Sequence, residues 1–388
     1  MKPNILIFCS WLDINSNVGI FFREQAELIS DQYNPILVVF KQKTVTKKNF
    51  NYFNIIGIEE KKTIEGLLVL EISYPYRDLF HYKINEYFKK LTIKNLNCFL
   101  TNKKIDISFI HAQSIFDAGI WAYHYYRQFK IPYIITEHNQ LSFYNVSKEK
   151  CNLVKKSLQN SARNLVVSND KIRQFVANGL FFDFVNIGNL INKKFFYEAE
   201  NSRSKSVRFI TIGAFSPIKD QITLLKALDL VDKQINNRIE FVWIGQNSWG
   251  NNQDENVSNL LTNFYFDNIN VILKPLLDRD EIANYLKTSH LFLFSSLSEG
   301  MPVSVLEALA CGLPVFTTNC GGVDEIINDK NGIIYQLKDY VKLSHLILSF
   351  LNNELEYDSD AISKEIIDRF GETAFRVNLL SIYQSIND

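Results

Sequence analysis

The stretch Leu291-Phe-Leu-Phe-Ser-Ser-Leu-Ser-Glu-Gly-Met-Pro-Val-Ser-Val-Leu-Glu-Ala-Leu-Ala-Cys-Gly-Leu-Pro-Val-Phe-Thr317 decides the fold. It opens with the apolar run Leu291–Phe294 and closes with a second one at Pro314–Thr317, both typical of buried strands. Between them the composition predicts a helix over Val303–Cys311, because Pro302 suits the start of a helix. A strand, a helix and another strand in this order predict an α/β fold with a parallel sheet.

Two glutamates in this stretch indicate a nucleotide site. Glu307 lies in the middle of an apolar helix, where an unpartnered carboxylate would cost several kcal/mol, so we expect it to have a polar partner. The helix N-terminus suits an anion, and Gly300 allows close backbone approach. Glu307 is five positions after Pro302, about 7.5 Å along the axis, which matches the distance from a diphosphate to its ribose diol. Glu299 would then lie beyond the phosphates. The alternative is a surface helix with an ordinary glutamate.

Strand-like and helix-like segments alternate along the whole chain. Polar residues over Glu198–Ser206 predict a linker between two domains. Two doubly wound domains would bind ligands at the carboxyl ends of their strands. Besides the two strands named above, we expect strands at Ile5–Cys9, Ile36–Phe40, Ile105–Ile110, Tyr133–Thr136, Asn164–Val167, Phe182–Ile187, Val207–Ile212, Phe241–Ile244 and Val271–Leu273, and helices at Phe21–Ser30 and Ile115–Phe129.

The segment from Ser295 onward resembles the signature of glycosyltransferase family 4, retaining enzymes of the GT-B fold. The resemblance implies that Glu307 binds the nucleotide ribose and that Glu299 lies by the donor sugar. It also implies that the backbone of Gly300, Met301, Pro302 and Val303 holds the diphosphate. By the same resemblance, the chain would form an N-terminal acceptor-side domain (1–197) and a C-terminal donor-binding domain (198–369). A last helix at about 370–388, periodic over Phe370–Tyr383, would cross back to the first domain.

The turn from Gly213 to Asp220 follows the first expected strand of the second domain. A lysine in such a turn, here Lys219, can neutralise a diphosphate leaving group. The same lysine is common at exposed turns with no such role. In family 4 the turn usually has an arginine as well, and Ala214 stands in its place.

Four further residues, at strand ends or in the turn after strand one, match the family pattern. The turn after strand one resembles a variant in which a glycine, here Gly19, lies under the donor diphosphate. His138 matches a histidine close to the donor sugar and the acceptor, and His111 matches a second one more loosely. Asn189 matches an asparagine that closes the N-terminal domain. Strand-end histidines are also common as structural residues.

No metal or nucleic acid is expected as a partner. Asp278-Arg279-Asp280 superficially resembles a metal-binding Asp-x-Asp motif, but it precedes a helical run, so the two acids are predicted to cap that helix. The histidines and cysteines have no zinc spacing. The basic half shows no RNP-type motif or recognition helix, so no nucleic-acid site is expected.

Charge is distributed unevenly over a chain with zero net charge. Residues 1–200 carry a balance of +8 and residues 201–388 a balance of −8, which suggests different partners for the two halves. Over Leu79–Lys94, four lysines (Lys83, Lys89, Lys90 and Lys94) alternate with apolar residues at helical spacing. This helix could rest on an anionic membrane surface, or it could be solvated and packed on its own sheet.

The location expected from these features is the cytoplasm, with peripheral attachment to the inner face of the cell membrane. No apolar run approaches the length of a membrane span, and the N-terminal residues predict a first strand rather than a secretory signal. The five cysteines lack CxxC spacing and indicate reduced thiols.

The function expected is a retaining glycosyltransferase that moves a sugar from a nucleoside-diphosphate sugar to a glycan or lipid-linked acceptor, in surface polysaccharide biosynthesis. Two alternatives are open. One is an epimerase or phosphorylase on the same fold, for which the sequence shows no lysine-containing cofactor motif. The other is a catalytically silent sugar-nucleotide-binding partner, for which Ala214 is the support.

Overall fold

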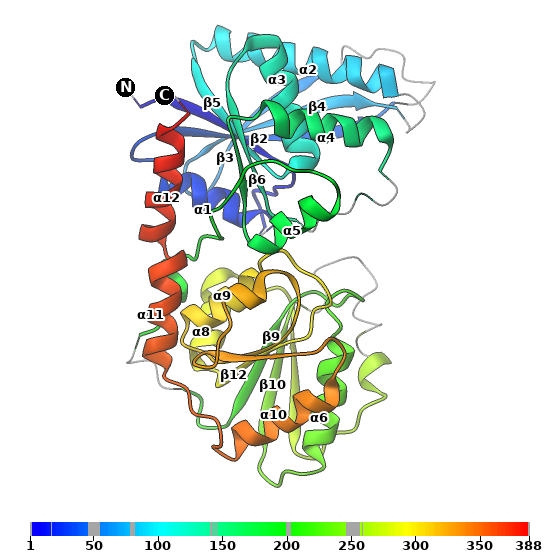
Figure 1. Cartoon of the computed structure of the whole chain (residues 1–388), viewed down its shortest axis with the longest axis vertical. Helices are drawn as coiled ribbons and strands as arrows, with labels where there is room; N and C mark the ends of the chain where they lie inside the picture. The colour runs from blue at the N-terminus through cyan, green and yellow to red at the C-terminus, as the bar shows by residue number, and fades with distance from the viewer. Residues whose placement is uncertain are drawn as a thin grey trace. The chain divides into compact units, whose positions relative to one another are not determined.

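The computed structural model divides the chain into two compact units, which are described separately (Figure 1). The first unit comprises 1–167, 171–190 and 376–388, and the second comprises 168–170 and 191–375. The structure describes residues 2–16, 18–45, 55–77, 82–139, 143, 146–198, 203–245, 257 and 259–386.

The first unit is built on an eight-stranded sheet in the order β3-β4-β2-β1-β5-β6-β7-β8. All neighbouring strands are parallel except β3 and β4, which are antiparallel. The strands are β1 (Asn4–Cys9), β2 (Asn34–Thr44), β3 (Gly57–Lys62), β4 (Leu68–Tyr76), β5 (Ile107–Gln113), β6 (Tyr133–Glu137), β7 (Arg163–Val166) and β8 (Phe184–Asn186). The helices are α1 (Ile20–Leu28), α2 (Tyr82–Asn102), α3 (Ile120–Phe129), α4 (Lys148–Asn160), α5 (Asn169–Ala177) and α12 (Glu372–Gln384), with a π-helical turn η2 (Ile115–Gly119).

Both faces of this sheet are covered, which explains why its central strands are apolar throughout. Leu6 and Phe8 point to the core shared with α2, α3 and α4. On the opposite face, the ring of Phe109 lies 4.8 Å from that of Tyr383 on α12. Figure 1 shows α2, α3 and α4 on one side of the sheet and α1 and α12 on the other.

The second unit is built on a parallel six-stranded sheet in the order β11-β10-β9-β12-β13-β14. Its strands are β9 (Arg208–Ile212), β10 (Ile239–Ile244), β11 (Ile269–Lys274), β12 (Leu291–Phe294), β13 (Val315–Thr318) and β14 (Gly332–Tyr335). Its helices are α6 (Gln221–Asp232), α8 (Arg279–Thr288), α9 (Val303–Ala310), α10 (Tyr340–Leu351) and α11 (Ser359–Phe370), with short 3-10 helices η3 (Lys193–Phe195) and η4 (Gly321–Glu325).

The core of this unit follows the alternation of its strands. Phe241 and Trp243 pack with α6 and α10, whereas Val242 and Ile244 are buried on the other face. Figure 1 shows α8 and α9 on that other side of the sheet.

The prediction of two doubly wound α/β units is confirmed, with each strand expected from the sequence present within four residues at either end. The last helix also joins the first unit from Arg376 onward, as the family resemblance implies. Three strands were missed: β3, β4 and β14. The β3 strand was missed because its sequence, Gly-Ile-Glu-Glu-Lys-Lys, is polar. It is an exposed edge strand that pairs antiparallel with β4.

Two helix predictions were wrong in detail. The run expected to be helical over Ile115–Phe129 begins with the kinked η2, where Asp117 has a φ of 65°, and α3 begins only at Ile120. The run expected over Phe370–Tyr383 is interrupted at Gly371, where α11 ends and α12 follows. Residues 199–202 of the expected linker lie outside the described residues, and Arg203 donates to the carbonyls of Ser289 and Gly312 within the second unit.

Candidate functional site

The strand order of the second unit brings two of the predicted site residues together. The order reverses between β9 and β12, so the loops that follow these two neighbouring strands leave the sheet side by side. Lys219 lies in the first loop and Glu299 in the second. Lys219 Nζ is 2.5 Å from Glu299 Oε1, and the side chains are 30% and 15% exposed.

Side chains of the second loop hold this ion pair in place. Ser296 is fully buried, and its hydroxyl donates to Glu299 Oε1 at 2.6 Å. Ser295 Oγ donates to the carbonyl oxygens of Lys219 and Asp220, which ties the two loops directly. Sequence analysis missed both serines, since nothing in their spacing distinguishes them from ordinary loop residues.

The backbone of the turn before α9 packs closely against a glycine, Gly321. Gly321 has a φ of 58°, and a Cβ there would come within 2.6 Å of the Gly300 carbonyl oxygen. Any larger residue would therefore displace the backbone that leads into the helix. Two buried residues, Met301 and Pro302, complete this turn, and α9 begins at Val303.

The expected polar partner of Glu307 is Arg279, at the start of α8. Glu307 is 4% exposed, and its Oε1 accepts a hydrogen bond from Arg279 Nη1. The Arg279 guanidinium also lies 4.5 Å from the centre of the Phe195 ring. Burial raises the pKa of Glu307 above its usual value, and the positive charge of Arg279 opposes that shift.

Arg279 is the main site residue that the sequence did not reveal. It lies between Asp278 and Asp280, and only these two aspartates were given a predicted role, as residues that cap the helix. That interpretation is confirmed: Asp278 forms a capping box with Glu281, and Asp280 lies in the first turn of α8. The signal that could have found Arg279 is the need of buried Glu307 for a cation.

The turn after β9 presents a single cationic residue, Lys219. Gly213 lies opposite it, so that a Cβ there would meet Lys219 Cδ at 3.7 Å. Ala214, where an arginine was expected, is 8% exposed, and its carbonyl accepts from the Gln221 side chain. Across the residues that the structure describes, no group of three or more His, Cys, Asp or Glu side chains is placed to hold a metal ion.

In the first unit, His138 lies at the end of β6 beside β5. Its Nε2 is 2.6 Å from Gln113 Oε1, and its ring is 4.9 Å from that of Phe21. Because an amide oxygen can only accept, Nε2 carries a proton in this arrangement. Burial lowers the pKa of His138 to about 4, which the Asn189 side chain partly opposes.

His111 has a structural environment. Its two ring nitrogens lie 2.7 Å from Tyr383 Oη and 2.7 Å from Thr136 Oγ1, and it is 1% exposed. Burial lowers its pKa to about 3, so it is neutral. It ties β5 to α12 and lies inside β5, two residues before the end of the strand, whereas the sequence predicted it at a strand end.

Gly19 is required by the fold. It is buried with a φ of 71°, and a Cβ there would come within 2.5 Å of the Trp11 carbonyl oxygen. These features explain the glycine without a ligand, so its role under a diphosphate stays a prediction.

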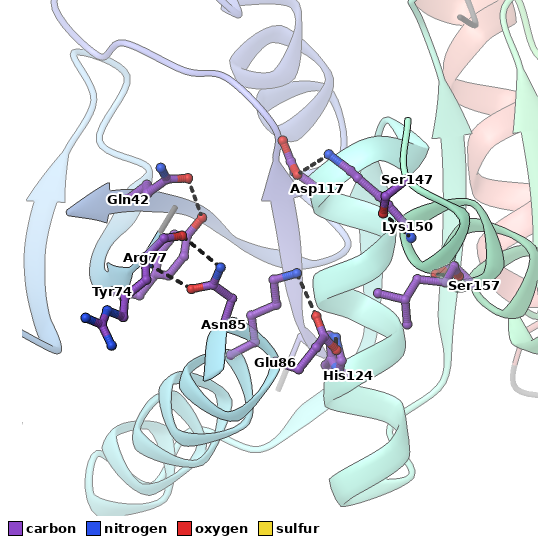
Figure 2. Close-up of polar contacts among 12 residues, drawn as sticks. Gln42, Tyr74, Arg77, Asn85, Glu86, Asp117, His124, Ser147, Lys150 and Ser157 are labelled. Atoms are coloured by element: carbon purple, nitrogen blue, oxygen red, sulfur yellow. Dashed lines mark hydrogen bonds and ion pairs between the residues drawn. The ribbon is translucent and has the colours of Figure 1, made fainter. Parts of the chain in front are cut away.

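The lysine-rich helix α2 has an inner and an outer side. Asn85 exchanges hydrogen bonds with the backbone of Arg77, and Glu86 lies beside His124, as Figure 2 shows. Lys89 is paired with Glu86 at 2.9 Å. The residues at 83, 87, 90 and 94 share the outer face: Lys83, Lys90 and Lys94 are exposed, and Tyr87 is 55% exposed. Leu79 and Phe80, also named in the prediction, lie outside the described residues.

Within the described part of the chain, no helix is both long and apolar enough to span a bilayer.

Comparison with known proteins agrees with this architecture. Residues 192–367 match the family model of glycosyl transferases group 1. An uncharacterized glycosyltransferase of Methanocaldococcus jannaschii, MJ1178, is 24% identical over 287 residues, which are 73% of this chain and 76% of that protein. The capsular polysaccharide biosynthesis glycosyltransferase CapH of Staphylococcus aureus is 29% identical over 258 residues, 63% of each chain.

Among solved structures, Anabaena HepE in complex with UDP superposes with a TM-score of 0.74 at 13% identity, covering 99% of this chain and 100% of that one. A likeness at this identity establishes the fold. The chain therefore has the GT-B fold, and residues 192–367 are similar to the glycosyl transferases group 1.

Proposed function

We propose that the protein is a retaining glycosyltransferase of the family 4 type. It transfers a sugar from a nucleoside-diphosphate sugar to a glycan or lipid-linked oligosaccharide, in the synthesis of a surface polysaccharide. Glycosyl transfer as the activity is supported by the group 1 domain. A sugar-nucleotide donor is supported by HepE, which was solved with UDP and with UDP-glucose.

One observation carries the proposal: the second unit places Lys219 and Glu299 in contact at its strand-order reversal, next to the start of α9. A diphosphate here would meet the Lys219 ammonium and the free N–H groups of the helix N-terminus. Glu307, one turn into α9, would accept from the ribose. Glu299 would face the sugar.

The barrier of this reaction comes from charge on the leaving diphosphate and on an oxocarbenium-like sugar. Lys219 and the amides at the start of α9 would stabilise the first charge, because they are fixed before the reaction begins. The Glu299 carboxylate would stabilise the second. No divalent metal is required in this scheme, since Lys219 and the helix N-terminus take its place. His138, whose Nε2 is bonded to Gln113, would contact the sugar or the acceptor.

Contact with an anionic membrane is part of the proposal. It rests on the +8 balance of residues 1–200 and on the outer face of α2, with its three exposed lysines and Tyr87. Each cation near such a surface contributes about 1 kcal/mol, enough for reversible binding. An acceptor anchored in the inner face of the cell membrane would then be within reach.

The test is a panel of nucleoside diphosphates and their sugars, scored by thermal stabilisation. A ligand at a hundred times its Kd stabilises the folded state by about 2.7 kcal/mol, which shifts the Tm measurably. Lys219→Met should abolish the shift. Lys226→Met, at an exposed lysine on α6, should preserve it.

Donor hydrolysis and transfer are then measured with the ligand that stabilises most. Turnover supports the enzyme, whereas binding without any turnover would favour the catalytically silent partner. Absence of stabilisation by every nucleotide in the panel would refute a sugar-nucleotide site.

A further inference from the structure

The Arg279 side chain is fixed more firmly than a salt bridge alone would fix it. Its backbone is fixed at the start of α8 by the capping box that Asp278 forms with Glu281. Its guanidinium is held between the Phe195 ring and Glu307, with 13% of the side chain exposed. The orientation of the Glu307 carboxylate is thereby set from two neighbouring elements, α8 and η3.

Arg279 binds only one of the two carboxylate oxygens of Glu307. Oε1 of Glu307 receives the hydrogen bond from Arg279. In the described part of the chain Oε2 has no hydrogen-bond partner, and this oxygen is not fully buried. A carboxylate oxygen can accept two hydrogen bonds, so Oε2 remains open to an added donor group.

We propose that Arg279 is a positioning residue for nucleotide recognition: it binds Oε1 of Glu307 and leaves Oε2 to accept from a ribose hydroxyl of the donor. This inference rests on the proposed function, which places the ribose beside Glu307. It adds a residue that sets the preference for a ribonucleotide over a nucleotide without the ribose diol.

Because Arg279 is charged, its loss should make the preference for the ribonucleotide depend on pH. Burial favours the protonated form of Glu307, and Arg279 is the charged group that favours the ionised form. The other groups around α9 do not replace it. Cys311, one turn on, is kept as a thiol because burial raises its pKa, and Lys194 on η3 is paired with Asp280. Helix α11 faces α9 with Ser363, which donates to the Ala310 carbonyl.

The experiment compares UDP with 2′,3′-dideoxy-UDP, or the same pair for another base if the donor panel selects one. Affinities are measured by calorimetry at about pH 8 and about pH 6. Wild type should prefer the ribonucleotide by about tenfold or more, at both pH values, because a hydrogen bond to a charged group is lost in the analogue. Arg279→Met should reduce this preference to about threefold or less, and more strongly at the lower pH, because burial without the charge of Arg279 favours the protonated form of Glu307.

Two variants control for folding and for loss of packing. Arg279→Lys keeps the charge and should restore much of the preference and its independence of pH. Arg208→Met removes an arginine of similar setting, paired with Glu240 at 2.8 Å and lying over Tyr285, and should leave the preference unchanged. A structural role alone would weaken both nucleotides equally and lower the Tm.

The outcomes separate this inference from the proposed function. If Glu307→Gln loses the preference while Arg279→Met keeps it at both pH values, Arg279 has no positioning role. If Glu307→Gln also keeps it, the ribose does not lie at Glu307, and both assignments fall. If wild type binds no nucleoside diphosphate, the proposed function itself is refuted.

Discussion

Replacing Glu299 by glutamine should tighten the binding of the nucleoside diphosphate while slowing transfer. In the structure, the carboxylate neutralises the lysine that is proposed to hold the diphosphate, with Nζ and Oε1 2.5 Å apart. Glutamine keeps the shape of the side chain and the contact with Ser296 but removes the negative charge. Lys219 would then offer its full charge to the phosphates.

The size of the effect follows from the exposure of the pair. A hydrogen bond to a charged group contributes about 1.5–3 kcal/mol when shielded, and exposed ion pairs contribute about 1 kcal/mol or less. Lys219 is 30% exposed, so we expect a gain of about 1 kcal/mol, or roughly fivefold in the affinity for UDP. Loss of the carboxylate beside the developing positive charge of the sugar should lower the transfer rate roughly tenfold to a hundredfold.

The assay combines calorimetry of UDP with single-turnover transfer from the donor that the panel identifies. Glu299→Asp keeps the charge and serves as the conservative variant. Glu240→Gln removes the carboxylate of a comparable ion pair, with Arg208, away from the site and should change neither quantity. Weaker UDP binding by Glu299→Gln, or an unchanged transfer rate, would refute the placement of Glu299 between the phosphates and the sugar.

Three other predictions address the metal, the membrane and the stability of the first unit. Transfer should persist after exhaustive treatment with EDTA, because Lys219 and the start of α9 supply the positive charge; complete loss that manganese or magnesium restores would show the phosphate site to be misassigned. Changing Lys83, Lys90 and Lys94 together to glutamate should weaken binding to anionic vesicles by about 1 kcal/mol per lysine and leave donor binding intact. Sedimentation with the vesicles at low salt measures this binding. Lys89 is kept because it pairs with Glu86, and Lys330, Lys342 and Lys364, exposed on the second unit, are changed as the control; wild type that never sediments would argue for a soluble acceptor. Burial alone would raise the pKa of Glu86, but His124 and Lys89 lower it to about 2, so its contribution to stability is present above about pH 4.5 and is lost as the pH falls toward 2. Glu86→Gln should therefore cost up to about 3 kcal/mol of unfolding free energy at pH 7 and much less near pH 3, as urea titration at both pH values would show; an equal loss at both would contradict the ion-pair explanation.

The sequence by itself determined the α/β architecture. Its buried strands are continuous apolar runs, and each sheet is covered on both faces, so a local pattern was enough to place most strands. The exposed edge strand β3 was not predicted because its residues are polar. The helix boundaries at Ile120 and Gly371 were not predicted because helical periodicity continues across them. The sequence also predicted a polar partner for Glu307, because a carboxylate in an apolar helix requires one, and its turn and family resemblance proposed Lys219 and Glu299 as site residues.

Only the tertiary structure decided which side chains meet. The contact of Lys219 with Glu299 joins residues 80 positions apart, and it depends on β9 and β12 being neighbours in the sheet. Arg279 and Glu307 meet because α8 packs beside α9, and the sequence around Arg279 carries the pattern of an ordinary helix start. His138 and His111 both follow the family pattern at strand ends, yet the one bonds to Gln113 and the other to Tyr383 on the last helix. Such pairings arise from the order of strands and the packing of helices, which no local pattern of residues encodes.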